Sequence, residues 1–550
     1  MSRSRSDRKA RREAERQERK AGHAPGRISS RADWKQALGL TLLAWIHRLL
    51  FLRSNRDWSW PYTIFYEGDS ETFYRYARHL LAGRLYDNGV PFHPPGFAWL
   101  LAGIHTLVGA GLPEDRVPYF AVKVVTALAG SLPVGLLYLL VKPYLGKTLA
   151  LVASLLCLYH FGLYVLAVAP LTEGTYLAIL LLALLVWSRR LTHPLSAPGA
   201  TPGGWGSALA LGVLLGALAL TRAEGVLIAA ILVGTGLVGW LRRRRETGFA
   251  ALRPWALVAA GWILAVSPWT LRNAVRLSEM NERLAGRLAE PLPTFVPLTI
   301  YGPLNLALAN NPQAQGTFSR DFLASRAHSP VLDLTDPEHL EFILHGDRMA
   351  REWIFENPGG FSRLVLRKWA LFFSAWKLGW TQWNVPAGLT GTRWPVDVFL
   401  PHSPAALAVS LPFTVLGLLY GLAIPGAPRR WAVVVLLLTA AGMVTTGLFF
   451  GYARLGLLVL PFWLTWTATG LVWLGERLIH RQSGWSRTLQ DLAPSPTLLR
   501  VLGGLALALF LLEAWGATTD RNFKATGTNV PGETYLDRDQ PVELEVLPRS

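Results

Sequence analysis

The feature that most constrains this chain is a series of apolar runs, each about as long as a lipid bilayer is thick. A helix needs roughly 20 apolar residues to cross the bilayer core, and helices satisfy their own backbone hydrogen bonds in lipid. The 550-residue sequence is therefore predicted to be an all-α integral membrane protein with many spans. The candidate runs lie at 36–52, 96–112, 119–140, 147–169, 173–189, 206–220, 224–241, 252–271, 363–380, 405–424, 431–450, 455–474 and 499–516.

The composition excludes ordinary soluble domains. Only 16% of the residues are charged and 51% are hydrophobic, whereas about a quarter of the residues in a soluble domain are charged. Cys157 is the single cysteine, so neither an intramolecular disulfide nor a cysteine zinc site is expected. The net charge of +18 is not interpreted as a nucleic-acid signal, because basic residues in a membrane protein mark the cytoplasmic side.

The basic connectors decide which of the apolar runs cross the membrane. All of them are cytoplasmic if the runs 96–112 and 363–380 do not cross, which gives about eleven crossings. The run 363–380 mixes basic and aromatic residues, and this mixture favours a helix lying in the headgroup plane. The connectors that support this topology carry Lys142 and Lys147, Arg189 and Arg190, Arg242 to Arg245, Arg429 and Arg430, and Arg477 and Arg481.

The topology predicts five parts along the chain. Residues 1–35 hold twelve Lys or Arg and five Asp or Glu, which predicts a cytoplasmic arm next to anionic membrane lipids. Residues 36–271 form an N-terminal transmembrane module with a first external loop at 53–118. An external cap at 272–404 includes the interfacial helix 363–380 and an amphipathic helix at 338–356 that ends at Asn357-Pro358-Gly359. Further transmembrane helices at 405–516 precede an external tail at 517–550.

In this topology the polar residues at the outer ends of the spans gather on one face of the membrane. Arg222 and Arg454 are basic residues on the side where such residues are rare, so each is expected to have a counter-ion. Guanidinium groups bind phosphate oxygens, and a carboxylate can accept a proton from an attacking hydroxyl. The cluster therefore indicates an anionic, lipid-borne substrate. Its members are Asp69, Glu71, His93, Glu173, Arg222, Glu224, Arg272, Asn273 and Arg454.

Each candidate also has a purely structural interpretation. Asp69 or Ser70 could cap a helix that Gly83 ends. His93, beside two prolines, could pack a loop, and Glu173 could simply begin a span. Arg222 and Glu224 could pair with each other rather than bind a substrate. The residues alone leave these alternatives open.

The ordered motifs resemble the GT-C glycosyltransferases, in the bacterial branch that includes relatives of protein O-mannosyltransferases and the lipid A aminoarabinose transferase (family 39-like). The resemblance covers residues 36 to 475. The motifs that carry it are Gly68-Asp69 with Tyr74 and Gly83, Pro94-Pro95-Gly96-Phe97, Pro170-Leu171-Thr172-Glu173, Leu220 to Gly225, Ser267 to Asn273, Asn310-Asn311-Pro312, Glu356-Asn357-Pro358 and Tyr452-Ala453-Arg454-Leu455.

The resemblance implies an inverting transferase that uses a polyprenyl-phosphate-linked sugar on the outer face of the membrane. By position, Asp69 is implied as the catalytic base or acceptor-orienting carboxylate, with Glu71 at a variable acidic position. Arg272 and Arg454 are implied to hold the lipid phosphate, and Arg222 is a weaker candidate. Tyr74, His93, Glu173, Glu224 and Asn273 are expected to contribute to substrate binding.

Several points of this hypothesis stay open. In many members of the family the acidic pair is adjacent, whereas here Ser70 separates its two members, so the acting carboxylate and the need for a divalent metal are not fixed. The acceptor could be a glycan, a lipid or a protein. The predicted location is the plasma (inner) membrane, with the active site outside the cytoplasm. The alternative is a transporter or flippase for a lipid-linked saccharide, but a transporter would hold its charges near the bilayer midplane.

Overall fold

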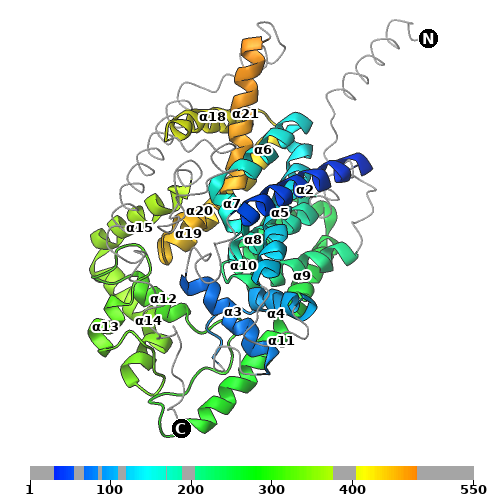
Figure 1. Cartoon of the computed structure of the whole chain (residues 1–550). Coiled ribbons are helices and arrows are strands. Elements are labelled where there is room, and N and C mark those ends of the chain that lie inside the picture. The colour runs from blue at the N-terminus through cyan, green and yellow to red at the C-terminus, as the bar shows by residue number, and fades with distance from the viewer. Residues whose placement is uncertain are drawn as a thin grey trace, which may run out of the picture.

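The computed structural model describes residues 30–54, 67–83, 90–108, 119–168, 170–188, 205–375 and 404–479, and within them the chain forms helices and no strands (Figure 1). The first half of the chain forms α2 (Arg31–Ser54), α3 (Glu67–Leu81), α4 (Gly96–Val108), α5 (Tyr119–Leu145), α6 (Lys147–Tyr159), α7 (Phe161–Val168), α8 (Thr172–Val186), α9 (Trp205–Thr221), α10 (Gly225–Thr247) and the short η3 (Phe249–Leu252).

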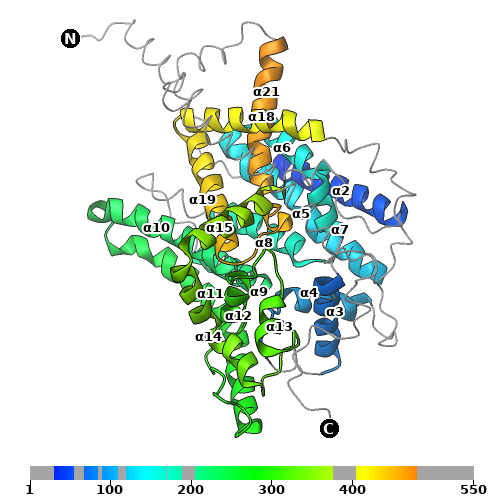
Figure 2. The same cartoon turned by 90° about the vertical axis from the view of Figure 1, so that its left-hand side faces the viewer.

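The second half of the chain begins with a long helix that leads into the external region. Its helices are α11 (Arg253–Arg283), α12 (Gly302–Ala309), α13 (Asp321–Ala327), α14 (Pro337–Glu356), α15 (Pro358–Phe373), α18 (Pro404–Ala423), α19 (Ala427–Leu448), α20 (Ala453–Gly456) and α21 (Leu460–Ile479). In two views at right angles, α12, α13 and α14 lie together at the end of the molecule away from α18 and α21 (Figures 1 and 2).

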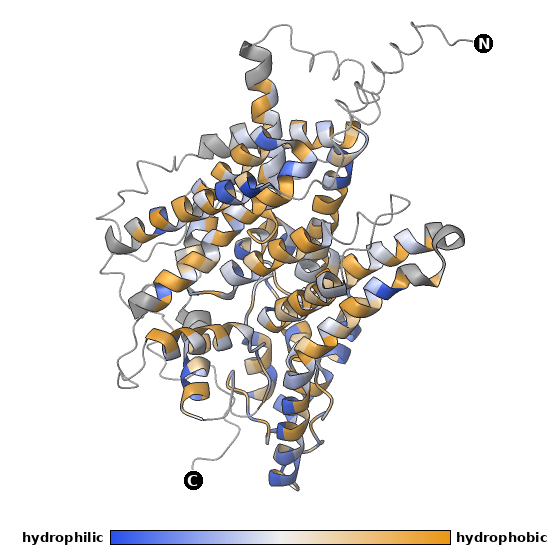
Figure 3. Cartoon of the chain, turned by 90° about the vertical axis from the view of Figure 1, so that its right-hand side faces the viewer, coloured by the Kyte–Doolittle hydropathy of each residue, from blue (hydrophilic) through white to orange (hydrophobic). Residues whose placement is uncertain are grey.

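Three helices of the described part are long and apolar enough to cross a membrane: Val122–Leu145 of α5, α11 and α19. Several shorter apolar helices accompany them, among them α6, α8, α9 and α10. Apolar residues predominate on the helices in the middle of the molecule, whereas hydrophilic residues gather toward the lower end, where α11 projects (Figure 3). The described part is thus all-helical and contains helices able to span a membrane, as predicted. The number of crossings stays a prediction.

One hydrophobic core joins helices of both halves of the chain, from α2 and α5 to α19 and α21, and in it α5 packs against α2, α6 and α8. Small residues let the neighbouring helices α9 and α11 approach at the backbone. A Cβ atom on Gly212 would lie 2.1 Å from the carbonyl oxygen of Val258, so this crossing needs a glycine. Close packing of this kind fixes α9 against α11.

A separate hydrophobic core forms around α12, α13 and α14, and in it Leu277 of α11 meets Leu304, Leu323 and Phe342. The predicted amphipathic helix 338–356 is present as α14. The Asp336 side chain caps it by accepting a hydrogen bond of 2.9 Å from the Glu338 amide, and the helix ends at Asn357 as expected. This part is therefore folded around its own apolar centre.

Three expected helix boundaries were wrong. The run 147–169 is not one helix, because the backbone is extended at His160 and separates α6 from α7. The run 252–271 continues as α11 to Arg283, so this helix extends well beyond its expected end. The helix that Gly83 follows with a φ of 68° begins at Glu67, which places Asp69 and Ser70 inside its first turn rather than at the cap.

The helix α15 covers the start of the predicted interfacial segment 363–380. Arg363 and Leu366 are exposed, as a helix in the headgroup plane requires. Lys368 departs from that expectation because it is completely buried, between α12 and the end of α19. Residues 376–380, the span 499–516 and the tail 517–550 lie outside the described residues.

Candidate active site

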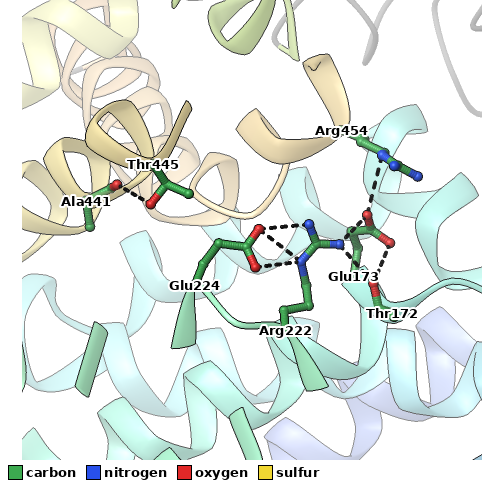
Figure 4. A network of polar contacts seen from close by, with 7 residues as sticks. All are labelled: Thr172, Glu173, Arg222, Glu224, Ala441, Thr445 and Arg454. Atoms are coloured by element: carbon green, nitrogen blue, oxygen red, sulfur yellow. Dashed lines mark hydrogen bonds and ion pairs between the residues drawn. The ribbon is translucent and has the colours of Figure 1, made fainter. Parts of the chain in front are cut away.

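A network of charged side chains joins the start of α8, the turn between α9 and α10, and the short helix α20 (Figure 4). Arg222, in the turn between α9 and α10, lies at its centre. Its Nη1 is 2.7 Å from Glu173 Oε1, and its Nη2 is 2.8 Å from Glu224 Oε1. The same Nη1 donates a hydrogen bond of 2.9 Å to the Thr172 hydroxyl. The structural alternative for Arg222 and Glu224, that they pair with each other, is therefore realised.

Arg454 reaches the same carboxylate from the other half of the chain. It lies in the short helix α20, and its Nε is 3.6 Å from Glu173 Oε1 (Figure 4). Its guanidinium also stacks over the ring of Tyr452, 5.3 Å from the ring centre. Glu173 is thus shared by two arginines that are far apart in sequence, and the expectation of a counter-ion for Arg222 and for Arg454 is confirmed.

Local backbone geometry explains how these side chains come together. Leu171 is extended and α8 begins at Thr172, so Glu173 lies in the first turn, where the helix dipole favours a carboxylate. The turn after α9 is closed by a hydrogen bond of 2.9 Å from the Gly225 amide to the Arg222 carbonyl. A Cβ atom on Gly225 would lie 2.6 Å from the Ala219 amide nitrogen, so the turn folds tightly back on α9.

The electrostatics of the turn between α9 and α10 keep its ion pair charged. Burial alone would lower the pKa of Arg222, but Glu224 and Glu173 outweigh it and raise that pKa above the usual range. For Glu224, burial alone would raise the pKa. The adjacent Arg222 guanidinium lowers it by more, so the pKa of Glu224 lies below its usual value. This pair is therefore fully ionised at neutral pH.

An apolar pocket adjoins this network. It is a narrow crevice between α8, α10, α15, α19 and the α20–α21 region, and Glu224 is the charged residue in its lining. Thr445 of α19 also lines it and donates a hydrogen bond of 3.0 Å to the Ala441 carbonyl (Figure 4). The aliphatic wall includes Leu180, Leu227, Ile228, Leu438, Leu458 and Val459. The arrangement places an apolar crevice directly beside a half-buried ion pair.

Arg272 and Asn273 lie on the outer part of α11 and have different environments. Asn273 is fully buried, and its amide donates a hydrogen bond of 3.0 Å to the Val296 carbonyl, which ties the following loop to α11. Arg272 is partly exposed and stacks on Trp269 with its guanidinium carbon 4.8 Å from the ring centre. Asn273 therefore has a clear role in the fold, whereas Arg272 keeps a surface open to solvent.

The helices α3 and α4, with the segment between them, contribute a cluster of aromatic rings. Tyr74 is buried in a hydrophobic cluster with Phe97 and Trp269. His93 Nδ1 is 3.0 Å from the Tyr76 hydroxyl oxygen, and its ring centre lies 5.5 Å from that of Tyr301. His93 therefore packs between α3 and Tyr301, as its structural interpretation expects, and its role in substrate binding stays a prediction.

The expected catalytic carboxylates belong to this loop as well. Asp69 and Glu71 lie near the start of α3, and their side chains fall outside the described part of the chain. Within the described residues, no group of three or more His, Cys, Asp or Glu side chains is arranged to hold a metal ion. The question of a metal near Asp69 therefore stays open.

Comparisons with known proteins agree with the sequence motifs. Residues 92–271 match the family model described as dolichyl-phosphate-mannose-protein mannosyltransferase. This region includes Glu173, Arg222 and Glu224 and ends immediately before Arg272. The resemblance to GT-C glycosyltransferases is confirmed. No curated protein sequence gives a significant match.

Several solved structures are also similar. The oligosaccharyltransferase of Archaeoglobus fulgidus, tethered to an acceptor peptide with the NVT sequon, has 13% identity and a TM-score of 0.43, with 93% of this chain covered. The same organism's AglB in complex with an inhibitory peptide and a dolichol-phosphate has 15% identity and a TM-score of 0.40. The chain spans about 60% of the length of these archaeal structures. ArnT from Cupriavidus metallidurans bound to undecaprenyl phosphate has 16% identity and a TM-score of 0.30, with 80% of this chain and 78% of that chain covered.

Proposed function

We propose that this GT-C-like membrane protein is a glycosyltransferase that moves a sugar from a polyprenyl-phosphate donor to an acceptor in the cell envelope. The observation that carries the proposal is the pair of arginines that share Glu173 beside an apolar crevice. A polyprenyl phosphate has the matching chemistry, with a long apolar tail and an anionic headgroup. The family match over residues 92–271 supports the same class of reaction.

The two arginines have different tasks in this proposal. Arg222 is held by hydrogen-bonded ion pairs with both Glu173 and Glu224, so its charge is already compensated. Arg454 lies 3.6 Å from Glu173, on the short helix α20, whose Leu455 lines the apolar crevice. We assign the donor phosphate to Arg454, with the partly exposed Arg272 as a second contact. Arg222 then holds Glu173 and Glu224 in place.

The proposed reaction is a direct displacement at the anomeric carbon. Asp69, with Glu71 as the alternative, accepts the proton of the acceptor hydroxyl as that oxygen attacks. The bond to the donor phosphate breaks with its electron pair, and Arg454 stabilises the charge that the leaving phosphate gains. The configuration of the sugar is inverted. The reaction takes place at the extracytoplasmic ends of the predicted eleven spans, in the plasma membrane.

The experiment that tests the function is mass spectrometry of envelope glycans and lipid-linked sugars. Cells that carry the wild-type protein are compared with cells that lack it and with cells that express Asp69→Asn at the same membrane level. We expect the product to disappear and the polyprenyl-phosphate sugar to accumulate in both altered strains. Arg276→Gln, which disrupts an exposed ion pair with Glu279 on α11, is the matched control and should behave as wild type.

Two outcomes would contradict parts of the proposal. Full product formation in Asp69→Asn cells would remove Asp69 from the mechanism and make Glu71→Gln the next variant. A chemically unchanged donor that merely remains on the inner leaflet in the deletion strain would instead support a transporter.

A further inference from the structure

The turn that carries Arg454 rests directly on the backbone of α15. A Cβ atom on Gly451 would lie 2.5 Å from the Lys368 carbonyl oxygen, and one on Gly456 would lie 2.0 Å from the Phe372 carbonyl oxygen. These two glycines flank Arg454 on either side in the sequence. The backbone of α15 thus contacts the turn before and after the arginine, with no side chain between them.

Lys368 forms hydrogen bonds at the beginning of this turn. It is 0% exposed, and its Nζ donates hydrogen bonds to Asn310 Oδ1 at 3.0 Å and to the Gly447 carbonyl at 3.2 Å. Asn310 in turn donates a hydrogen bond of 2.7 Å to the Leu448 carbonyl. The ammonium therefore lies at the C-terminal end of α19, where the helix dipole favours a cation.

Two further hydrogen bonds join the segment 310–318 to the rest of the turn. The Gly451 amide donates a hydrogen bond of 2.7 Å to the Gly316 carbonyl. The Phe318 amide donates a hydrogen bond of 2.7 Å to the hydroxyl of Tyr452, the residue on whose ring Arg454 stacks. Residues 310–318 and α15 thus act together on the segment 447–452, immediately before Arg454.

The buried ammonium has no carboxylate partner among the described residues. Its two hydrogen-bond acceptors are neutral oxygens, and burial lowers the pKa of Lys368 to about 7. Burying a cation without a counter-ion costs free energy, and an apolar side chain of similar size could fill the same space. An apolar side chain could not donate hydrogen bonds to both Asn310 Oδ1 and the Gly447 carbonyl.

We infer that Lys368 is a positioning residue that, together with Asn310, sets the place of Arg454 and thereby the affinity for the phosphate of a lipid donor. This inference rests on the proposed function, in which Arg454 binds that phosphate. Lys368 does not itself touch the donor. It acts by fixing the segment 447–452, so that the guanidinium is presented beside Glu173 before the donor arrives.

The test measures binding of undecaprenyl phosphate to the purified full-length protein in lipid nanodiscs. The variants are Lys368→Met, which keeps the length but loses the hydrogen bonds, Arg454→Ala and the double variant. We expect about tenfold weaker binding in each single variant, equivalent to about 1.4 kcal/mol. The double variant should bind no more weakly than Arg454→Ala, because Lys368 acts through Arg454. Lys368→Gln, which keeps one amide donor, should recover part of the affinity.

Arg363→Met is the matched control, because Arg363 lies on the same helix α15 and is exposed. It should bind undecaprenyl phosphate as the wild type does. If Lys368→Met does not give a monodisperse protein, binding is compared between Lys368→Gln, Arg454→Ala and the double variant of these two changes.

The outcomes separate the inference from the proposed function. Normal binding in Lys368→Met with weak binding in Arg454→Ala would overturn the inference and leave the function standing. Additive losses in the double variant would also overturn it. Normal binding in Arg454→Ala would instead contradict the phosphate role in the proposed function.

Discussion

Two cationic centres of this molecule, one half-buried at Arg222 and one fully buried at Lys368, differ in how their charge is compensated. Around Arg222, two carboxylates lie within hydrogen-bond distance, and the ion pair is kept ionised. Around Lys368, both acceptors are neutral oxygens, and the pKa falls to about 7. The first centre therefore depends on charge, whereas the second depends on the geometry of its hydrogen bonds.

The difference fits the parts that each centre joins. Arg222 connects α8 with the turn between α9 and α10, inside the region that matches the family model. Lys368 connects α15, α12 and the end of α19, and it lies outside that region. In the proposed function, the first centre shapes the polar end of the donor site, and the second fixes the arginine that enters the site from the other half of the chain.

The largest effect should follow from Arg222→Met. This change leaves Glu173 and Glu224 without their shared guanidinium, and breaking a buried ion pair of this kind costs about 3 kcal/mol. We expect a clear drop in the thermal unfolding temperature in detergent, followed by intrinsic fluorescence. Arg276→Met removes an exposed ion pair and should change the stability by less than about 1 kcal/mol. Equal drops in the two variants would contradict the view that the Arg222 centre depends on charge.

A smaller effect should appear when the pH is raised from 7 to 9. The folded protein releases the Lys368 proton near pH 7, whereas the unfolded chain keeps it up to its ordinary pKa of 10.5. The unfolded state then binds more protons, so stability contributed by Lys368 rises with pH, by at most about 1.4 kcal/mol per unit. The wild type should gain stability relative to Lys368→Met across this range. Parallel curves for the two proteins would show that Lys368 keeps its proton in the fold.

The stability that the Arg222 centre contributes should change at low pH instead. The pKa of Glu224 is lowered in the folded state, so its contribution to stability is present above its ordinary pKa of 4.5 and is lost as the pH falls below that value. Between pH 7 and 9, this centre should therefore contribute no change, and the Lys368 effect can be measured separately.

The sequence was informative where a local charge argument applied. The predicted topology put Arg222 and Arg454 on the side of the membrane where basic residues are rare, and this led to the prediction of the counter-ions that the structure contains. The helix 338–356 was predicted from its periodicity and its Asn-Pro-Gly stop, and α14 confirms it. Such features depend on short stretches of the chain, so they can be predicted without knowledge of tertiary contacts.

The sequence was less informative where tertiary packing decides. Hydropathy does not distinguish one helix from two at His160, because both sides are apolar. Lys368 was grouped with the interfacial basic residues, since its burial depends on Asn310 and Gly447, which are distant in sequence. Gly451 and Gly456, on either side of Arg454, were the available sign that another backbone lies close to that turn. The roles of Asp69 and Glu71 stay predictions.

The most direct test of the central claim measures the dependence of sugar transfer on the lipid donor in Arg454→Ala membranes. The account places Arg454 at the donor phosphate, so the KM for the polyprenyl-phosphate sugar should rise about tenfold, or about 1.4 kcal/mol, while the KM for the acceptor stays as in the wild type. An unchanged donor KM, or an equal rise in both constants, would contradict it.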